Sequence, residues 1–152
     1  MELEDALRRS TPTTRQGLAP LFPVVVALPT LLGMAHHVDH IVRGNHVGWP
    51  LAPEITPFTY SLVIYPAIAV GLYLTATDRA GRRFWTGFFG VSTAFLAVIH
   101  LGPWAVEPPA DVIAPYVDPV AGYLAFTVLL GLLASVGYGT VYTARLWLRG
   151  DP

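Results

Sequence analysis

The sequence predicts an all-α integral membrane protein, a four-helix up-down bundle with both termini in the cytoplasm. Hydrophobic residues make up 53% of the 152 residues and charged residues 12%. That charged share is about half of what is usual in a soluble domain. Four stretches are apolar over the roughly 20 residues that a helix needs to cross a bilayer. None of the four has Lys, Arg, Asp or Glu in its middle.

The first two predicted spans cover residues 18–36 and 57–77. The first contains three prolines, among them Pro29, so we expect this helix to be kinked or to begin late. The second begins with Thr56 and Pro57, a hydroxyl side chain followed by proline at the first helical position. This pair is typical of a helix start.

The third and fourth predicted spans cover residues 84–102 and 119–144. Gly102 and Pro103 predict the end of the third helix. Asp118, just before a proline, is the expected N-cap of the fourth. The predicted organisation is a single membrane domain with short ends: a polar cytoplasmic segment at 1–17, the four-helix domain at 18–147 and a cytoplasmic tail at 148–152.

The placement of arginine predicts how the chain is oriented. Eight of the nine basic residues lie before the first span, between the second and third, or after the fourth: Arg8, Arg9, Arg15, Arg79, Arg82, Arg83, Arg145 and Arg149. The positive-inside rule makes that side cytoplasmic. The loops at 37–56 and 103–118, which contain only Arg43, then face outward. We therefore expect a multi-pass protein of the plasma membrane.

The histidines gather at the predicted outward face. The chain has five of them: His36, His37, His40, His46 and His100. At a helical rise of about 1.5 Å per residue, His36 lies about 31 Å beyond Arg15, and His100 about 25 Å beyond Arg83. The hydrocarbon core is about 30 Å thick, so both histidines reach its outer edge. The first and third spans run in the same direction, so these helix ends can meet.

Helical spacing predicts a metal site at this edge. If the first helix continues past Ala35, His36 and His40 lie four residues apart on one face, the familiar spacing of two imidazoles on one metal. Imidazole and carboxylate ligands suit zinc, iron or copper. The predicted ligands are His36, His37, His40 and His100, with weaker candidates Asp39, His46 and Glu54, and with Arg43, Tyr60 and Tyr123 in the outer shell.

The string from His36 to His40, His-His-Val-Asp-His, resembles one histidine box of the membrane fatty-acid desaturases and hydroxylases. The resemblance covers five residues. Those enzymes combine several such boxes to hold a pair of irons, whereas this chain has five histidines in all.

Several functions are open at this point. A catalytic metal would activate water or oxygen against a lipid-soluble substrate that enters between the helices. Alternatively, His100 and one of the histidines on the first helix hold haem b in a redox subunit. A third reading is a non-catalytic subunit of a larger membrane complex or a homo-oligomer, because small residues on the fourth span favour close helix contacts. Histidines at a membrane edge also serve as proton sensors, headgroup contacts or helix-end hydrogen bonds.

Other classes of function find no support in the sequence. Without cysteine the chain has no disulfide and no thiolate metal site. A net charge of -1 and the lack of a basic patch give no reason to expect nucleic acid as a partner. The outward segment 104–117 is expected to lie in the headgroup region, where Glu107 and Asp111 are interpreted as solvated loop charges.

Overall fold

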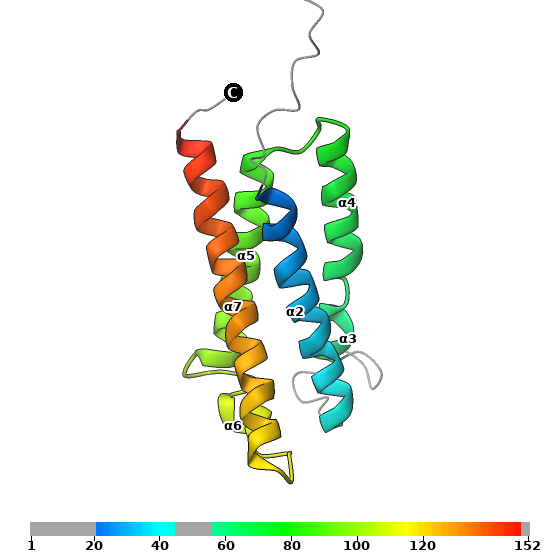
Figure 1. Ribbon diagram of the computed structural model, residues 1–152, viewed down its shortest axis with the longest axis vertical. Helices are drawn as coiled ribbons and strands as arrows, with labels where there is room; N and C mark the ends of the chain where they lie inside the picture. Colours follow the sequence, from blue (N-terminus) through cyan, green and yellow to red (C-terminus); the bar gives the residue numbers. More distant parts are fainter. Residues whose placement is uncertain (1–20, 45–55, 150–152) are drawn as a thin grey trace, which may run out of the picture.

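The computed structural model describes residues 21–44 and 56–149, and every regular element in these ranges is a helix (Figure 1). Four helical stretches are long and apolar enough to cross a membrane: Phe22–Arg43, Phe58–Ala76, Arg82–Leu101 and Pro119–Leu148. Their outer surface is apolar, with Leu31, Val91 and Leu124 each more than 60% exposed. A surface of this kind is suited to lipid. The predicted segment 1–17 and the last three residues lie outside the described residues.

Helix α2 (Phe22–Arg43) begins later than the predicted first span and extends seven residues past its predicted end at His36. Pro23 occupies the first turn, where a missing N–H is harmless, and the helix continues through Pro29. It ends at Gly44, whose φ of 63° is the left-handed conformation that glycine adopts without strain. Because α2 extends this far, His36, His37, His40 and Arg43 lie on one continuous helix.

The second predicted span is two helices, α3 (Pro57–Ser61) and α4 (Ile64–Ala76), separated by a turn at Leu62 and Val63. The turn has a local cause in Pro66. Proline has no N–H to donate to the carbonyl four residues earlier, that of Leu62, and its ring conflicts with that carbonyl. The Leu62 carbonyl instead accepts a shorter-range bond from the Tyr65 N–H at 3.2 Å.

Helix α5 (Arg82–Leu101) ends at Gly102, as predicted, and α7 (Pro119–Leu148) begins at Asp118, whose side chain accepts a hydrogen bond from the Val120 N–H at 3.0 Å. Between them lies the short α6 (Pro109–Ile113), packed against the start of α7. At that contact the backbone of α6 comes so close that a Cβ on Gly122 would lie 2.4 Å from the Ile113 carbonyl oxygen.

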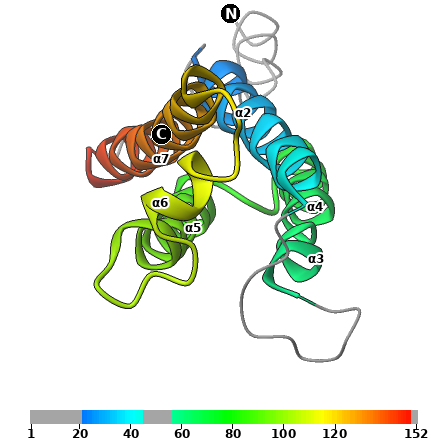
Figure 2. The ribbon, with the colours of Figure 1, turned by 90° about the horizontal axis from the view of Figure 1, so that it is seen from below.

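The core lies where α2, α5 and α7 meet, and it is richest at the end of the molecule away from α6 (Figure 1). Trp85 is fully buried there, and its indole N–H donates to the Thr75 hydroxyl at 2.8 Å. Phe89 fits against Gly139, where an added Cβ would lie about 3.0 Å from the phenyl ring. Seen along the bundle, α2 lies between α7 and the α3–α4 pair, with α5 on the other side of α7 (Figure 2).

Candidate metal centre

Three side chains bring possible metal ligands together at the end of the bundle that carries α3 and α6. The ligand atoms of His36, His40 and Glu107 all lie within 4.8 Å of one another. The two histidine Nε2 atoms are 3.2 Å apart, and His40 Nε2 is 3.3 Å from Glu107 Oε2. In a tetrahedral site with metal–nitrogen bonds of about 2.05 Å, ligand atoms lie about 3.3 Å apart. The group could therefore hold a metal ion with little rearrangement.

Glu107 reaches this group because the chain folds back after α5. Its N–H donates to the carbonyl of Ile99 at 3.1 Å, which places the residue beside the last turn of that helix. His100 Nδ1 lies 3.2 Å from the Glu107 carbonyl oxygen and 3.3 Å from its Oε2. Both atoms are acceptors, so a neutral His100 carries its proton on Nδ1. Glu107 is 3% exposed, and its interpretation as a solvated loop charge is wrong.

His100 contacts the same group, but it is not one of the three residues whose ligand atoms lie within 4.8 Å of one another. Its ring is in edge contact with that of His36, with the centroids 5.1 Å apart. Together with its contact to Glu107, this position allows His100 to orient the carboxylate toward His36 and His40. The predicted meeting of the α2 and α5 ends is thus present, with Glu107 as the link between them.

A buried charge network surrounds the three residues. Arg43, whose side chain is 1% exposed, binds Asp39 Oδ2 and Glu107 Oε1, each at 2.7 Å. It also donates to the carbonyl oxygen of Asp111 at 2.9 Å. Asp39 and Arg43 lie four residues apart on α2, and the Arg43 Nε also donates to Asp39 Oδ2 at 2.7 Å. With neutral imidazoles, two carboxylates and one guanidinium leave the network with one net negative charge, which a bound cation would offset.

His36 has one polar atom without a partner. Its side chain is 5% exposed, and its Nδ1 makes no hydrogen bond. Asp39 Oδ2 lies 3.9 Å from this atom. A small approach would let Nδ1 donate to that carboxylate, the arrangement that commonly orients a metal-bound imidazole.

His37 binds the α3–α4 pair through both of its ring nitrogens. Its Nδ1 lies 2.6 Å from the Tyr65 hydroxyl and its Nε2 2.8 Å from the Ser61 hydroxyl. The Ser61 hydroxyl donates to the carbonyl of Phe58, so it accepts from His37. Tyr65 then donates to Nδ1. Both ring nitrogens of His37 are occupied, and the residue connects α2 to the broken second span.

Tyr116 completes the network from the segment after α6. Its hydroxyl donates a short hydrogen bond to Asp39 Oδ1, the oxygen that Arg43 does not bind. Burial, and next the hydrogen bond to Asp39, raise the pKa of Tyr116 to about 12. Because the folded-state pKa exceeds the ordinary value of 10.0, the contribution of this bond is complete below about pH 10 and is lost as pH rises toward 12.

Tyr116→Phe is expected to lower the free energy of unfolding by about 1.5–3 kcal/mol, the range for hydrogen bonds to charged groups, because Asp39 loses a donor. Unfolding in mixed micelles measures the change. Tyr138→Phe is the matched control, since Tyr138 is 55% exposed on α7. Equal changes in the free energy of unfolding for the two substitutions would show that the Tyr116 hydrogen bond does not contribute to stability.

The remaining predicted site residues are more scattered. Tyr60 lines the cavity described below, whereas Tyr123 is 61% exposed on α7. The tyrosines that contact the network and His37 are Tyr116 and Tyr65. The weaker candidates His46 and Glu54 lie outside the described residues.

Comparisons of the chain with protein-family models, curated proteins and solved structures found no match. The function is therefore inferred from the residues and distances above.

Proposed function

We propose that the protein is a metal-dependent membrane protein in which His36, His40 and Glu107 bind one zinc or iron ion. The observation that carries this proposal is the spacing of the three ligand atoms, all within 4.8 Å, beside the buried ion pairs that Arg43 forms with Asp39 and Glu107. Two histidines and one carboxylate are the ligand set of catalytic zinc sites and of non-haem iron sites. Both kinds of site leave a coordination position for water or substrate.

The proposed orientation is the one that the arginines predict: an up-down bundle in the plasma membrane, with both termini cytoplasmic and the metal at the outer edge of the bilayer. Trp104, which is 85% exposed in the segment before α6, supports this placement, since tryptophan favours the membrane interface. The proposed activity is activation of water or oxygen at the metal, directed at a lipid-soluble substrate.

Haem b is less well supported by the geometry. Two axial imidazoles bind haem from opposite faces, so the porphyrin has to separate them. The rings of His36 and His100 are in edge contact at 5.1 Å, and those of His36 and His40 at 4.7 Å. A haem between His36 and His100 would require the ends of α2 and α5 to move apart, and His36 and His40 lie one turn apart on the same helix and cannot bind it from opposite faces.

Metal content of the tag-free protein, purified in mild detergent and measured by plasma mass spectrometry, tests the proposal. About one zinc or iron per chain is expected. Loss of an outer-shell partner typically weakens metal binding by roughly 10–100-fold. His40→Ala removes a direct ligand, so we expect it to weaken metal binding by more than this. His37→Ala is the matched control on the same helix, because His37 binds Tyr65 and Ser61 instead, and it should retain the metal.

Two results would overturn the proposal. One is equal metal loss in both variants. The other is wild-type protein that stays well below one metal per chain after zinc, iron(II) and copper are supplied, which would favour a non-catalytic subunit of a larger complex. An absorption band of haem in the blue would instead identify the haem-binding alternative.

A further inference from the structure

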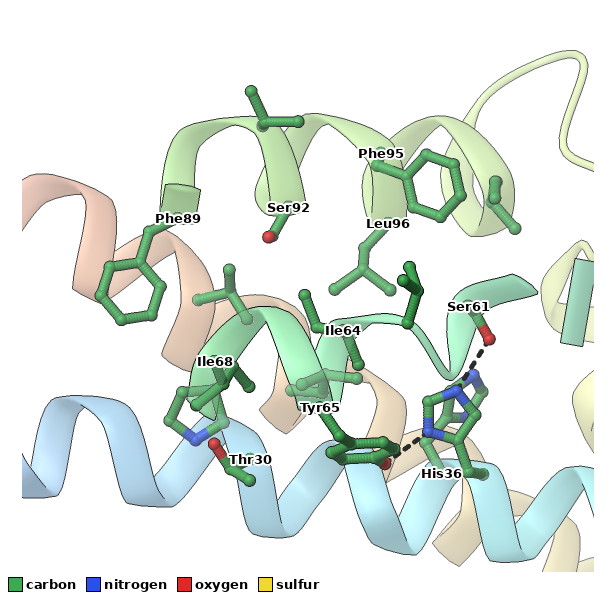
Figure 3. A pocket seen from close by; sticks show the side chains of 18 of the residues that line it. Thr30, His36, Ser61, Ile64, Tyr65, Ile68, Phe89, Ser92, Phe95 and Leu96 are labelled. Atoms are coloured by element: carbon green, nitrogen blue, oxygen red, sulfur yellow. Dashed lines mark hydrogen bonds between the residues drawn. The ribbon is translucent and has the colours of Figure 1, made fainter. Parts of the chain in front are cut away.

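An elongated cavity of about 410 Å³ extends from the metal site into the membrane-spanning part of the bundle. Its walls come from α2, the α3–α4 pair, α5 and α7. Ile64 and Ile68 on one side face Ser92 and Leu96 on the other (Figure 3). The cavity therefore lies between the second and third spans, with α2 along its floor.

The two ends of this cavity differ in chemistry. One end has His36, His40, His100 and Glu107, and the other is closed by aromatic side chains that include Trp85. Two hydroxyl groups, those of Thr30 and Ser92, line the cavity between the ends. Each donates to a carbonyl of its own helix, at 2.7 Å and 2.8 Å, so neither has a hydrogen to offer a ligand. The cavity is thus polar at the metal end and hydrocarbon-like along its length.

The length of the cavity fits an extended hydrocarbon chain. Trp85 and His100 both line the cavity and are 15 positions apart on α5, which corresponds to about 22 Å along the helix. A chain with its polar head at the histidine end can therefore extend toward Trp85.

The rim of the cavity faces the outside of the bundle. Val63, Val91 and Phe95 line the cavity and are also 66%, 72% and 44% exposed. They lie on the turn between α3 and α4 and on α5, at the side where these two spans are apart (Figure 2). In a bilayer this opening faces lipid tails, so an apolar chain can enter without crossing water.

We propose that this cavity binds the chain of a single-chain amphiphile, such as a long-chain alcohol, acid or aldehyde. The tail lies toward Trp85, the small polar head lies at the His36–His40–Glu107 group, and the molecule enters from the bilayer between α4 and α5. The role of the head rests on the proposed function, since the metal would act on it. Binding of the chain depends only on the cavity.

Bromine quenching of Trp85 fluorescence tests this binding. A variant with Trp49, Trp104 and Trp147 changed to phenylalanine retains Trp85 as its only tryptophan. The protein is placed in phospholipid nanodiscs, because detergent would itself occupy the cavity. We expect saturable quenching by hexadecanol brominated at the terminal carbon, and little quenching by the isomer brominated beside the hydroxyl-bearing carbon.

Blocking variants show whether the quencher is in the cavity. Ser92→Phe fills the middle of the cavity and should abolish the quenching, whereas Ala94→Phe adds the same bulk on the exposed side of α5 and should not. Gly33→Leu is a second blocking variant, because a Cβ at Gly33 has its nearest neighbours at 3.9 Å and 4.0 Å. Either blocking variant suffices if the other fails to fold.

Three outcomes would overturn the chain-binding proposal: equal quenching by both isomers, quenching that does not saturate, and quenching that survives both blocking variants. Saturable quenching by phospholipid with terminally brominated chains, but not by the alcohol, would replace the proposed occupant with a membrane lipid. Repeating the titration on metal-free protein separates the two proposals. Terminal quenching without any metal binding would leave chain binding intact and remove the proposed metal function.

Discussion

Replacement of Arg43 by alanine is expected to lower the free energy of unfolding by about 3–5 kcal/mol, the range found when one partner of a buried ion pair is removed. The side chain is 1% exposed and forms ion pairs with two carboxylates, Asp39 and Glu107. Without it both buried carboxylates would lose their ion pair with the guanidinium, and the Asp111 carbonyl would lose a donor. Unfolding in mixed micelles measures the loss.

The matched control is Arg83→Ala. Arg83 lies over the ring of Trp147 at 5.4 Å on the exposed surface, a contact worth about 0.5–1 kcal/mol. A loss for Arg43→Ala no larger than for Arg83→Ala would contradict the account of the network.

The Arg43→Ala variant also tests whether a metal ion binds at the charge network. Removing the guanidinium leaves the network with two negative charges, so a divalent cation should restore part of the lost stability through binding to the folded state. Adding His40→Ala should abolish that restoration. Zinc that stabilises the single and the double variant equally would indicate binding elsewhere.

Gly122→Ala is the second substitution with a large expected effect. Its Cβ would lie 2.4 Å from the carbonyl oxygen of Ile113 and 3.1 Å from two further backbone atoms, so α6 must shift. Overpacking of this kind typically costs about 1–3 kcal/mol. Glu107 and Tyr116 flank α6 in the chain, so we expect the shift to weaken metal binding as well as stability.

Gly137→Ala on the same helix is the control for Gly122→Ala. An added Cβ there meets the Thr93 methyl group at 3.9 Å, an ordinary contact, and alanine favours helix over glycine by about 1 kcal/mol. This variant should be neutral or more stable, with unchanged affinity in a cobalt(II) titration. Equal losses in the two variants would show that the effect is not specific to the α6 contact.

The sequence predicts the helices well because each is encoded locally. Apolar stretches, the Gly102-Pro103 stop and the Asp118 cap are visible without any tertiary information, and all three predictions agree with the structure. The pairing of His36 with His40 also follows from helical spacing alone. The interruption at Leu62 also has a signal in the sequence, because Pro66 cannot donate a helical hydrogen bond to the Leu62 carbonyl.

The rest of the site depends on contacts between distant segments. Glu107 lies between apolar and proline residues, and nothing in its neighbourhood indicates burial, since the fold-back is fixed by Ile99, His100 and Arg43. One signal was available: Arg43 is the only basic residue on its predicted side and needed acidic partners. Tyr65, not Tyr60, binds His37, and it lies on α4, beyond the turn that interrupts the second span.

The residues of the charge network come from distant parts of the sequence, and this affects how the protein is inserted into the membrane. Asp39 and Arg43 are one helical turn apart, so their ion pair can form as soon as α2 is helical, before any other span has left the ribosome. In the proposed orientation, α2 would then cross the bilayer with these two charges already paired, which lowers the barrier to translocation. Glu107 is synthesised after α5 and gains Arg43 only when the third span is in place. Metal loading would therefore be a late step in biogenesis.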